Sequence, residues 1–296
     1  MAIVHQFSYA RPSNLDEALA LMDRHAAAAA ILAGGTDLVV NLKEGRARPS
    51  IVVDIKGITE LQRLHVADGK LEIGALATFS DLLRAESVRT DFPLIAESAG
   101  TVASVGIRNR ATLVGNLCSA VPSLDCGPAL LVHDAQVHVV SIHGSRAISI
   151  HEWFTGPKIT ALQPGELVVS VSIPRPIKPH ASCYMKLGRY RGEDLAQAGI
   201  AVMAVDGFTY RIAHSALAPA ARRARFVESI LDGAVLDQGV LRLATAALAR
   251  EIAPITDMRA TAAYRRHLAG VMLERGLREA VRRLHARGPV ALGRLP

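Results

Sequence analysis

Two short segments of this 296-residue sequence combine glycines with hydroxyl side chains in a way that suits an anionic ligand. In the first segment, an apolar run ends in Gly34 and Gly35, and Thr36 follows. A strand that stops in two glycines exposes several backbone N–H groups at one point, and the missing β-carbons allow a phosphate to approach closely. Thr36 adds a hydroxyl donor. The segment is neither G-x-G-x-x-G nor a Walker A loop, and an ordinary tight turn is the alternative interpretation.

The second segment, residues 109–125, is predicted to be a long loop rich in small and hydroxyl residues. Loops of this length in compact domains are often functional. Its candidate donors and acceptors for phosphate and sugar oxygens are Thr112, Asn116, Ser119, Ser123 and Asp125. The alternative is a turn-rich surface loop in which Asp125 caps a helix that Pro128 begins.

Regular elements are predicted on both sides of the first segment. Apolar residues at helical spacing predict a helix over 15–25, and a strand near 30–33 leads into the glycines. A helix over 36–42 and a buried β-branched strand over 51–55 complete a strand–loop–helix–strand unit.

Hairpins and short helices are predicted around the second segment. A hairpin over 61–74 turns at residues 67–70. Helices are expected over 79–89 and 93–104, and strands over 136–142, 146–150 and 167–174.

Prolines at 174, 176 and 179 mark a predicted domain boundary, because proline cannot extend a helix or a central strand. Beyond them the pattern predicts three or four strands, within 182–190, 199–206 and 209–217, and then three helices near 220–231, 237–250 and 259–287. Strands followed by helices indicate an α+β layer.

The composition narrows the class of protein. Half of the residues are hydrophobic and 21% are charged, which is typical of a globular chain. The apolar run 26–33 is too short to cross a bilayer, and the amino terminus does not resemble a secretory signal. Three cysteines are too few for an all-cysteine iron–sulfur site and suit a reducing compartment, so we expect a cytoplasmic protein.

The net charge is +7, and much of the excess positive charge lies in the last predicted helix. Its arginines are Arg259, Arg265, Arg266, Arg275, Arg278, Arg282, Arg283 and Arg287. With 4% aromatic residues and no recognisable nucleic-acid motif, we interpret them as a solvated face or a protein contact rather than a nucleic-acid surface.

Taken together, the two segments resemble the flavin loops of the FAD-binding (medium) subunit of molybdenum hydroxylases, the family of xanthine dehydrogenase and aerobic carbon monoxide dehydrogenase. Residues 33–37 match the first loop, residues 107–112 lead into the second, and Asp125 stands where that loop ends. Where the family usually has the first of two glycines, this chain has Val114.

The resemblance extends over essentially the whole chain. It includes Asp54 and Ile55 after the buried strand, Lys186 within 184–187, and the carboxy-terminal stretch 252–265. It implies an α+β fold, with a two-part FAD-binding domain of the PCMH/vanillyl-alcohol-oxidase type over 1–176 (subdomains about 1–56 and 57–176) and a smaller α+β domain over 177–296. That second domain would combine an antiparallel sheet with helices.

The resemblance also implies one bound FAD and no metal or catalytic side chain on this chain. The implied cofactor-binding residues are Leu32, Ala33, Gly34, Gly35, Thr36, Asp37, Leu38, Thr112, Gly115, Asn116, Ser119, Ser123, Asp125 and Lys186. Asp125 would hold sugar hydroxyls, and Lys186 would approach the flavin or its diphosphate.

The implied function is electron transfer within a larger complex. Substrate would be oxidised at molybdopterin on a large subunit, and electrons would cross two [2Fe-2S] clusters on a small subunit to reach FAD here. The resemblance implies a hetero-hexamer of paired trimers, and it leaves open the substrate and the acceptor, which is NAD, oxygen, a quinone or a cytochrome. The alternatives are a self-contained flavin oxidoreductase and a non-catalytic binding module that uses the arginine-rich helix.

Overall fold

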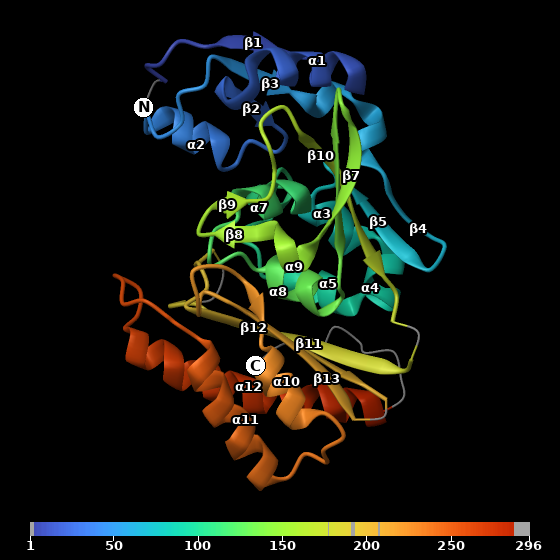
Figure 1. The fold of residues 1–296 in the computed structure, drawn as a ribbon, viewed down its shortest axis with the longest axis vertical. Helices are drawn as coiled ribbons and strands as arrows, with labels where there is room; N and C mark the ends of the chain where they lie inside the picture. Colours follow the sequence, from blue (N-terminus) through green and yellow to red (C-terminus); the bar gives the residue numbers. More distant parts are fainter. Residues whose placement is uncertain (1–2, 177, 191–192, 207, 287–296) are drawn as a thin grey trace. The chain divides into compact units, whose positions relative to one another are not determined.

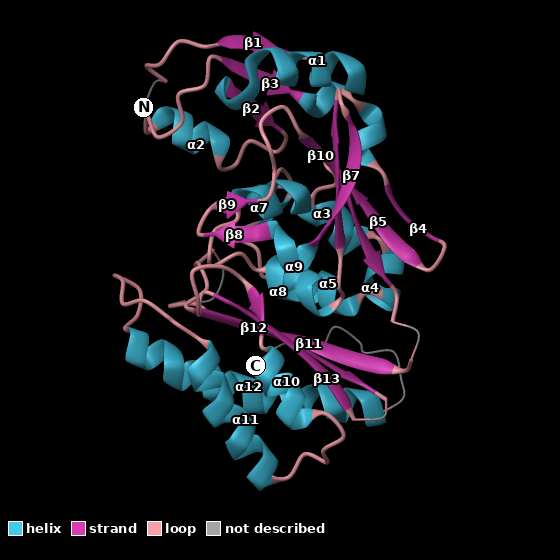
Figure 2. Ribbon diagram, viewed as in Figure 1, coloured by secondary structure: helices cyan, strands magenta, loops and turns pink. Residues whose placement is uncertain are grey.

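The computed structural model describes residues 3–176, 178–190, 193–206 and 208–286, so Arg287 lies outside the described residues. The chain forms two compact units, each built from separate stretches of sequence (Figure 1). Unit 1 comprises residues 1–85, 102–120 and 134–174, and unit 2 comprises residues 86–101, 121–133 and 175–296. Both units combine helices with sheets, as the predicted α+β class requires (Figure 2).

Unit 1 begins with a three-stranded parallel sheet in the order β1 (Ser8–Ala10), β3 (Ile51–Asp54), β2 (Ala29–Leu32). The predicted first helix is α1 (Leu15–His25), whose N-cap Asn14 accepts a hydrogen bond from the N–H of Glu17. The strands predicted near 30–33 and over 51–55 are confirmed as β2 and β3. The prediction missed β1, because three residues are too few to show a periodicity.

A five-stranded antiparallel sheet forms the larger part of unit 1. Its order is β4 (Leu64–Ala67), β5 (Lys70–Gly74), β10 (Leu167–Pro174), β6 (Gln136–Ser141), β7 (Gly144–Ser149). The predicted hairpin turn between the first two strands is confirmed: Asp68 and Gly69 both have positive φ, at 50° and 70°. A small β8 (Phe154–Gly156) and β9 (Ile159–Thr160) pair follows α9 (Ile150–Trp153).

Two helix predictions in unit 1 and its neighbouring segments need correction. The helix predicted over 79–89 is two helices, α3 (Phe79–Arg84) and α4 (Glu86–Asp91), because Ala85 between them has an extended backbone. The helix predicted over 93–104 ends at Gly100 as α5 (Pro93–Gly100).

The prediction of a long loop over 109–125 was wrong. It contains α7 (Leu113–Ser119), which follows the short α6 (Val105–Arg108). Its glycine and small polar residues concealed the helix, since such residues are common in turns. The apolar residues Leu113, Val114 and Leu117 are all buried, and this tertiary burial stabilises the helix.

Unit 2 is centred on a four-stranded antiparallel sheet, as predicted for the smaller domain. The strands follow chain order: β11 (His180–Leu187), β12 (Ala198–Val205), β13 (Thr209–Ser215) and β14 (Arg222–Arg223). α10 (Arg225–Leu231), α11 (Gln238–Glu251) and α12 (Ala262–His285) follow. The first of these begins later than predicted because residues 222–223 pair with β13.

Helices cover both faces of this sheet (Figure 2). Cys183 and Val202 lie against Gly276 of α12, whereas Tyr184 and Lys186 reach Asp125 at the start of α8 (Cys126–Val132). Since successive side chains of a strand point to opposite faces, this alternation explains why β12 is almost continuously apolar. Each compact unit is built from separate stretches of sequence. The predicted division into domains over 1–176 and 177–296 stays a prediction.

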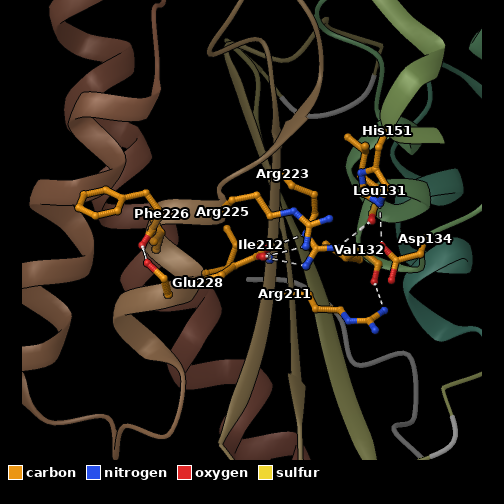
Figure 3. A network of polar contacts seen from close by, with 12 residues as sticks. Leu131, Val132, Asp134, His151, Arg211, Ile212, Arg223, Arg225, Phe226 and Glu228 are labelled. Atoms are coloured by element: carbon orange, nitrogen blue, oxygen red, sulfur yellow. Dashed lines mark hydrogen bonds and ion pairs between the residues drawn. The ribbon is translucent and has the colours of Figure 1, made fainter. Parts of the chain in front are cut away.

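A buried polar network joins four elements of unit 2, namely α8, β13, β14 and α10 (Figure 3). The Glu228 carboxylate of α10 accepts from the backbone N–H of Ile212 at 2.7 Å and from Nε and Nη2 of Arg223 at 2.5 and 2.8 Å. Arg223 also donates to the carbonyl of Leu131 at the end of α8. The side chains of Glu228 and Arg223 are only 10% and 5% exposed, so this ion pair is shielded from water.

The described part of the chain contains no helix that is both long and apolar enough to cross a membrane.

We expect Glu228→Gln to lower the free energy of unfolding by about 3 kcal/mol, because it leaves a buried guanidinium without its counter-charge. Urea denaturation of the full chain measures this change. Glu274→Gln is the matched control, since Glu274 forms a solvent-accessible i,i+4 pair with Arg278 and should change the stability by about 0.5 kcal/mol or less. Equal effects of the two variants would contradict a structural role of the buried network.

His214 makes the stability of unit 2 depend on pH. Burial lowers the pKa of His214 to about 4, whereas the unfolded chain protonates it near 6.5. The unfolded state therefore binds more protons between these values, and this contribution to stability is lost as the pH falls through that window, by about 3 kcal/mol in all. We expect His214→Asn to flatten the decline in unfolding free energy between pH 6.5 and 4, whereas His267→Asn, at an exposed position, leaves it unchanged.

Candidate functional site

The first candidate segment leaves the parallel sheet at its carboxyl edge. β2 and β3 are neighbours, with Leu32 opposite Asp54, so residues 33–37 and residues 55–57 leave the sheet side by side. In open parallel sheets, ligands bind outside the carboxyl ends of the strands. The fold therefore places the glycine pair where a binding site is expected.

Each glycine of the first segment has its own structural reason. Gly35 has a φ of +77°, a conformation that side chains with a β-carbon rarely adopt. Gly34 lies so close to the second segment that an added Cβ would be 2.1 Å from the carbonyl oxygen of Arg110. Among the described residues, the N–H groups of Gly34, Gly35 and Thr36 have no hydrogen-bond acceptor. These donors remain available for a ligand.

The second segment presents a helix start rather than a loop. Thr112 is the N-cap of α7, and its hydroxyl oxygen accepts from the N–H of Gly115 at 2.9 Å. The predicted use of the Gly115 N–H for a pyrophosphate therefore competes with this internal bond, whereas the Thr112 hydroxyl can still donate. Val114, the departure from the family pattern, is one of the buried apolar residues of α7.

Asn116 carries an unsatisfied acceptor. Its Oδ1 atom is buried and has no partner among the described residues. A buried polar atom without a partner is costly, and such atoms in folded proteins call for an explanation. A ligand donor is one explanation that fits a binding segment.

A direct hydrogen bond joins the two segments. The hydroxyl of Ser119, at the end of α7, donates to the carboxylate of Asp37. Trp153 fixes the same helix from its other side, because its buried indole N–H donates to the Leu117 carbonyl at 3.0 Å. Two predicted site residues from distant parts of the sequence are thus brought together within unit 1.

A pocket of about 170 Å³ adjoins Gly34. Ala33, Gly34 and Thr112 of the predicted site line it together with residues that the sequence analysis missed, among them Lys56, Asn109 and Arg110. The signal that could have identified Lys56 was its position two residues after β3, next to the strand that leads into the glycines. Nothing in the sequence specified that pairing of strands.

Asp125 and Lys186 form a buried ion pair within unit 2. Lys186 Nζ lies 2.9 Å from Asp125 Oδ2 and 2.8 Å from the carbonyl oxygen of Thr101, and the Tyr184 hydroxyl donates to Asp125 Oδ1 at 3.0 Å. Burial raises the pKa of Asp125, although Lys186 and Tyr184 favour its ionised form. The alternative in which the Asp125 side chain caps α8 was wrong, because it makes no capping hydrogen bond. Ser123, half-buried, belongs to the same unit.

Within the described ranges no cluster of three or more histidine, cysteine or acidic side chains could hold a metal ion. Cys118, Cys126 and Cys183 are free thiols.

Comparison with known proteins identifies the family. Residues 5–176 match the family model described as the FAD binding domain in molybdopterin dehydrogenase, and residues 182–280 match the CO dehydrogenase flavoprotein C-terminal domain. The chain belongs to the family of FAD-binding subunits of molybdenum hydroxylases. It is accordingly an oxidoreductase subunit, and the resemblance predicted from the sequence is confirmed.

Several relatives of this FAD-subunit family match over nearly their whole length. The putative xanthine dehydrogenase FAD-binding subunit of Escherichia coli strain K12 is 30% identical over 93% of this chain and 96% of its own. The carbon monoxide dehydrogenase medium chain of Hydrogenophaga pseudoflava is 31% identical over 93% and 97%.

Solved structures show the same fold. A chain in a structure of carbon monoxide dehydrogenase from Hydrogenophaga pseudoflava superposes with a TM-score of 0.91 at 31% identity, covering 96% of this chain and 99% of that one. A chain in the structure of quinoline 2-oxidoreductase from Pseudomonas putida 86 gives a TM-score of 0.88 at 26% identity, covering 94% and 98%. The predicted arrangement of an FAD-binding domain followed by a smaller domain is therefore confirmed.

Gly34→Ala should reduce the FAD content of the purified protein about tenfold or more, because the new β-carbon would force the two segments apart. The ratio of flavin to protein absorbance measures the effect. Gly106→Ala is the matched control, since the nearest atom to its added Cβ would be 3.9 Å away. Full FAD content in the Gly34→Ala protein would show that this contact does not position the site.

Proposed function

We propose that this chain is the FAD-holding exit of a multi-subunit molybdenum hydroxylase, taking electrons from a partner's [2Fe-2S] clusters and passing them to an external acceptor. The observation that carries the proposal is the meeting of the two segments at the carboxyl edge of the parallel sheet. There Gly34 lies against Arg110, and Ser119 binds Asp37. Family membership supplies the cofactor class.

The residues of unit 1 fit an FAD diphosphate and its sugar. The unpartnered N–H groups of Gly34, Gly35 and Thr36 would donate to phosphate oxygens. The Thr112 hydroxyl would add a donor, and the buried Oδ1 of Asn116 would accept from a ligand hydroxyl.

The remaining residues of the proposed site have weaker individual support. Ser119 and Asp37 already bind each other, so their proposed role is to hold the segments together around the ligand. We keep Leu32, Ala33, Leu38, Gly115 and Ser123 as contact residues on the family resemblance.

Asp125 and Lys186 keep their proposed roles in unit 2. Each Asp125 oxygen already accepts one hydrogen bond and has capacity for another, which a sugar hydroxyl would use. Lys186 donates twice within the unit and retains a third N–H. Its positive charge would favour an anionic group of the ligand.

When bound, FAD supplies the conversion between one-electron and two-electron transfer, so this chain needs no acid–base pair of its own. The work of the protein is to bind and orient. The backbone donors of 34–36 fix the anionic end, and the buried helix α7 keeps those donors aligned with Thr112 and Asn116. No proton transfer by a side chain is required by this proposal.

We infer partners of the same kind as those of the relatives. Relatives from Hydrogenophaga pseudoflava and Afipia carboxidovorans are medium chains, which implies a large and a small companion. The large chain would hold molybdopterin and the small one the two [2Fe-2S] clusters, since three cysteines here cannot supply four thiolates. Paired trimers and a reducing, cytoplasmic compartment belong to the same proposal.

The first experiment is an absorption spectrum of the protein purified from its native host, recorded before and after denaturation. We expect flavin bands, release of the chromophore on denaturation because the binding is non-covalent, and two co-purifying chains, one larger and one smaller. Reduction of the bound flavin by the complex's own substrate would be followed at the same wavelengths.

The other outcomes separate the alternatives. A flavin-containing chain that purifies alone and reduces its flavin with a small substrate would favour a self-contained oxidoreductase. A colourless chain that stays empty after incubation with FAD would contradict the proposal and favour a binding module.

A further inference from the structure

Two basic side chains line the pocket beside the glycine segment. Lys56 follows the carboxyl end of β3, and Arg110 lies in the backbone stretch that packs on Gly34. Both line the pocket of about 170 Å³ together with Gly34 itself. Because β2 and β3 are neighbours, the cationic residue Lys56 lines the pocket that adjoins the glycine segment.

Lys56 is held in position by a buried carboxylate. Its Nζ atom lies 2.8 Å from Oδ1 of Asp54, which also accepts the backbone N–H of Lys56 at 3.0 Å. The Tyr9 hydroxyl donates to the other oxygen of Asp54 at 2.6 Å. Since Asp54 is only 4% exposed, the ammonium group has a fixed anchor and two N–H donors left for a ligand.

The anchor stays charged at neutral pH. Burial alone would raise the pKa of Asp54, but the hydrogen bonds from Lys56 and Tyr9 outweigh it and lower the pKa. Asp54 therefore offsets one of the two positive charges. Among the described residues, Arg110 makes no side-chain hydrogen bond or ion pair, so the pocket keeps an uncompensated positive charge.

The lining indicates which part of a nucleotide would enter. Asn109, Thr78 and Gln62 add polar side chains to the two cations, although apolar atoms make up most of the exposed lining. Whole-ligand pockets are usually about 300–1,000 Å³, so a space of about 170 Å³ suits only a portion of a ligand. The positive charges of Lys56 and Arg110 favour an anionic portion.

We propose that Lys56, assisted by Arg110, binds the diphosphate of the flavin nucleotide. The inference rests on the proposed function and adds two residues to its site. Lys56 acts as a charged donor that the Tyr9–Asp54 pair aims, and Arg110 adds long-range attraction from an exposed position. Backbone N–H groups of residues 34–36 complete the set of donors.

The test uses the full chain freed of flavin and titrated calorimetrically with FAD. We expect Lys56→Gln to raise the Kd for FAD about tenfold, the loss expected for one partly screened, charge-assisted hydrogen bond. Arg110→Gln should raise the Kd by a smaller factor than Lys56→Gln does, because the Arg110 side chain is exposed. Lys70→Gln, at an exposed turn of unit 1, is the matched control and should leave the Kd unchanged.

Inorganic pyrophosphate provides an independent probe of the same contact. It should compete with FAD for the unmodified chain, and its inhibition constant should rise in Lys56→Gln. Lys56→Arg should restore most of the affinity for both ligands, since it returns the charge. Should Lys56→Gln fail to fold because Asp54 loses its partner, Arg110→Gln and the pyrophosphate competition decide the matter.

The outcomes distinguish this inference from the function beneath it. A chain that binds no FAD overturns the proposed function. A chain that binds FAD, but in which Lys56→Gln and Arg110→Gln keep the original Kd or pyrophosphate fails to compete, overturns the inference alone.

Discussion

The approach of two backbones, at Gly34 and at Arg110, is the constraint on which the arrangement of unit 1 depends. No residue with a β-carbon fits at position 34, because its Cβ would stand 2.1 Å from a carbonyl oxygen. That approach keeps the segment after β2 against the segment before α7, and the Ser119–Asp37 hydrogen bond joins them again one helix length further on. The free N–H groups of the first segment and the polar start of α7 are close together for this reason.

Because helices cover both faces of the sheet in unit 2, its buried charged side chains need hydrogen-bond partners within the protein. Asp125 and Lys186 are each only 10% exposed on their side chains, and a buried ion pair repays its desolvation only when further hydrogen bonds satisfy its atoms. Tyr184 and the Thr101 carbonyl supply those bonds. The Arg223–Glu228 pair obeys the same rule with the backbone of Ile212. Removing one partner of such a pair leaves a buried charge without compensation, which is strongly destabilising.

The arginines of the last helix illustrate the difference between composition and contact. Arg265 is buried and donates to the carbonyl of Gln197 and to Asp257, and Arg283 binds Glu279 and Glu97. Arg278 and Arg282 pair with glutamates of the same helix. Two arginines of α12, Arg265 and Arg283, therefore contribute to packing within unit 2, whereas Arg278 and Arg282 form solvent-exposed pairs on the surface of the helix.

The sequence by itself determined most regular elements, the mixed fold and the two glycine-containing segments, since periodicity and turn chemistry are local properties. It also determined the family, because the pattern around 33–37 and 107–112 is specific when both parts occur together. It did not reveal α7, whose small polar residues resemble a turn until Leu113 and Leu117 are buried.

Only the tertiary structure decided which distant residues meet. Lys56 became a candidate because β3 pairs with β2, and Asp125 proved to be an ion-pair partner instead of a helix cap because β11 places Lys186 beside it. The physical reason is that strand pairing and the burial of charge depend on residues far apart in the chain, and local pattern carries no information about which of them will come into contact.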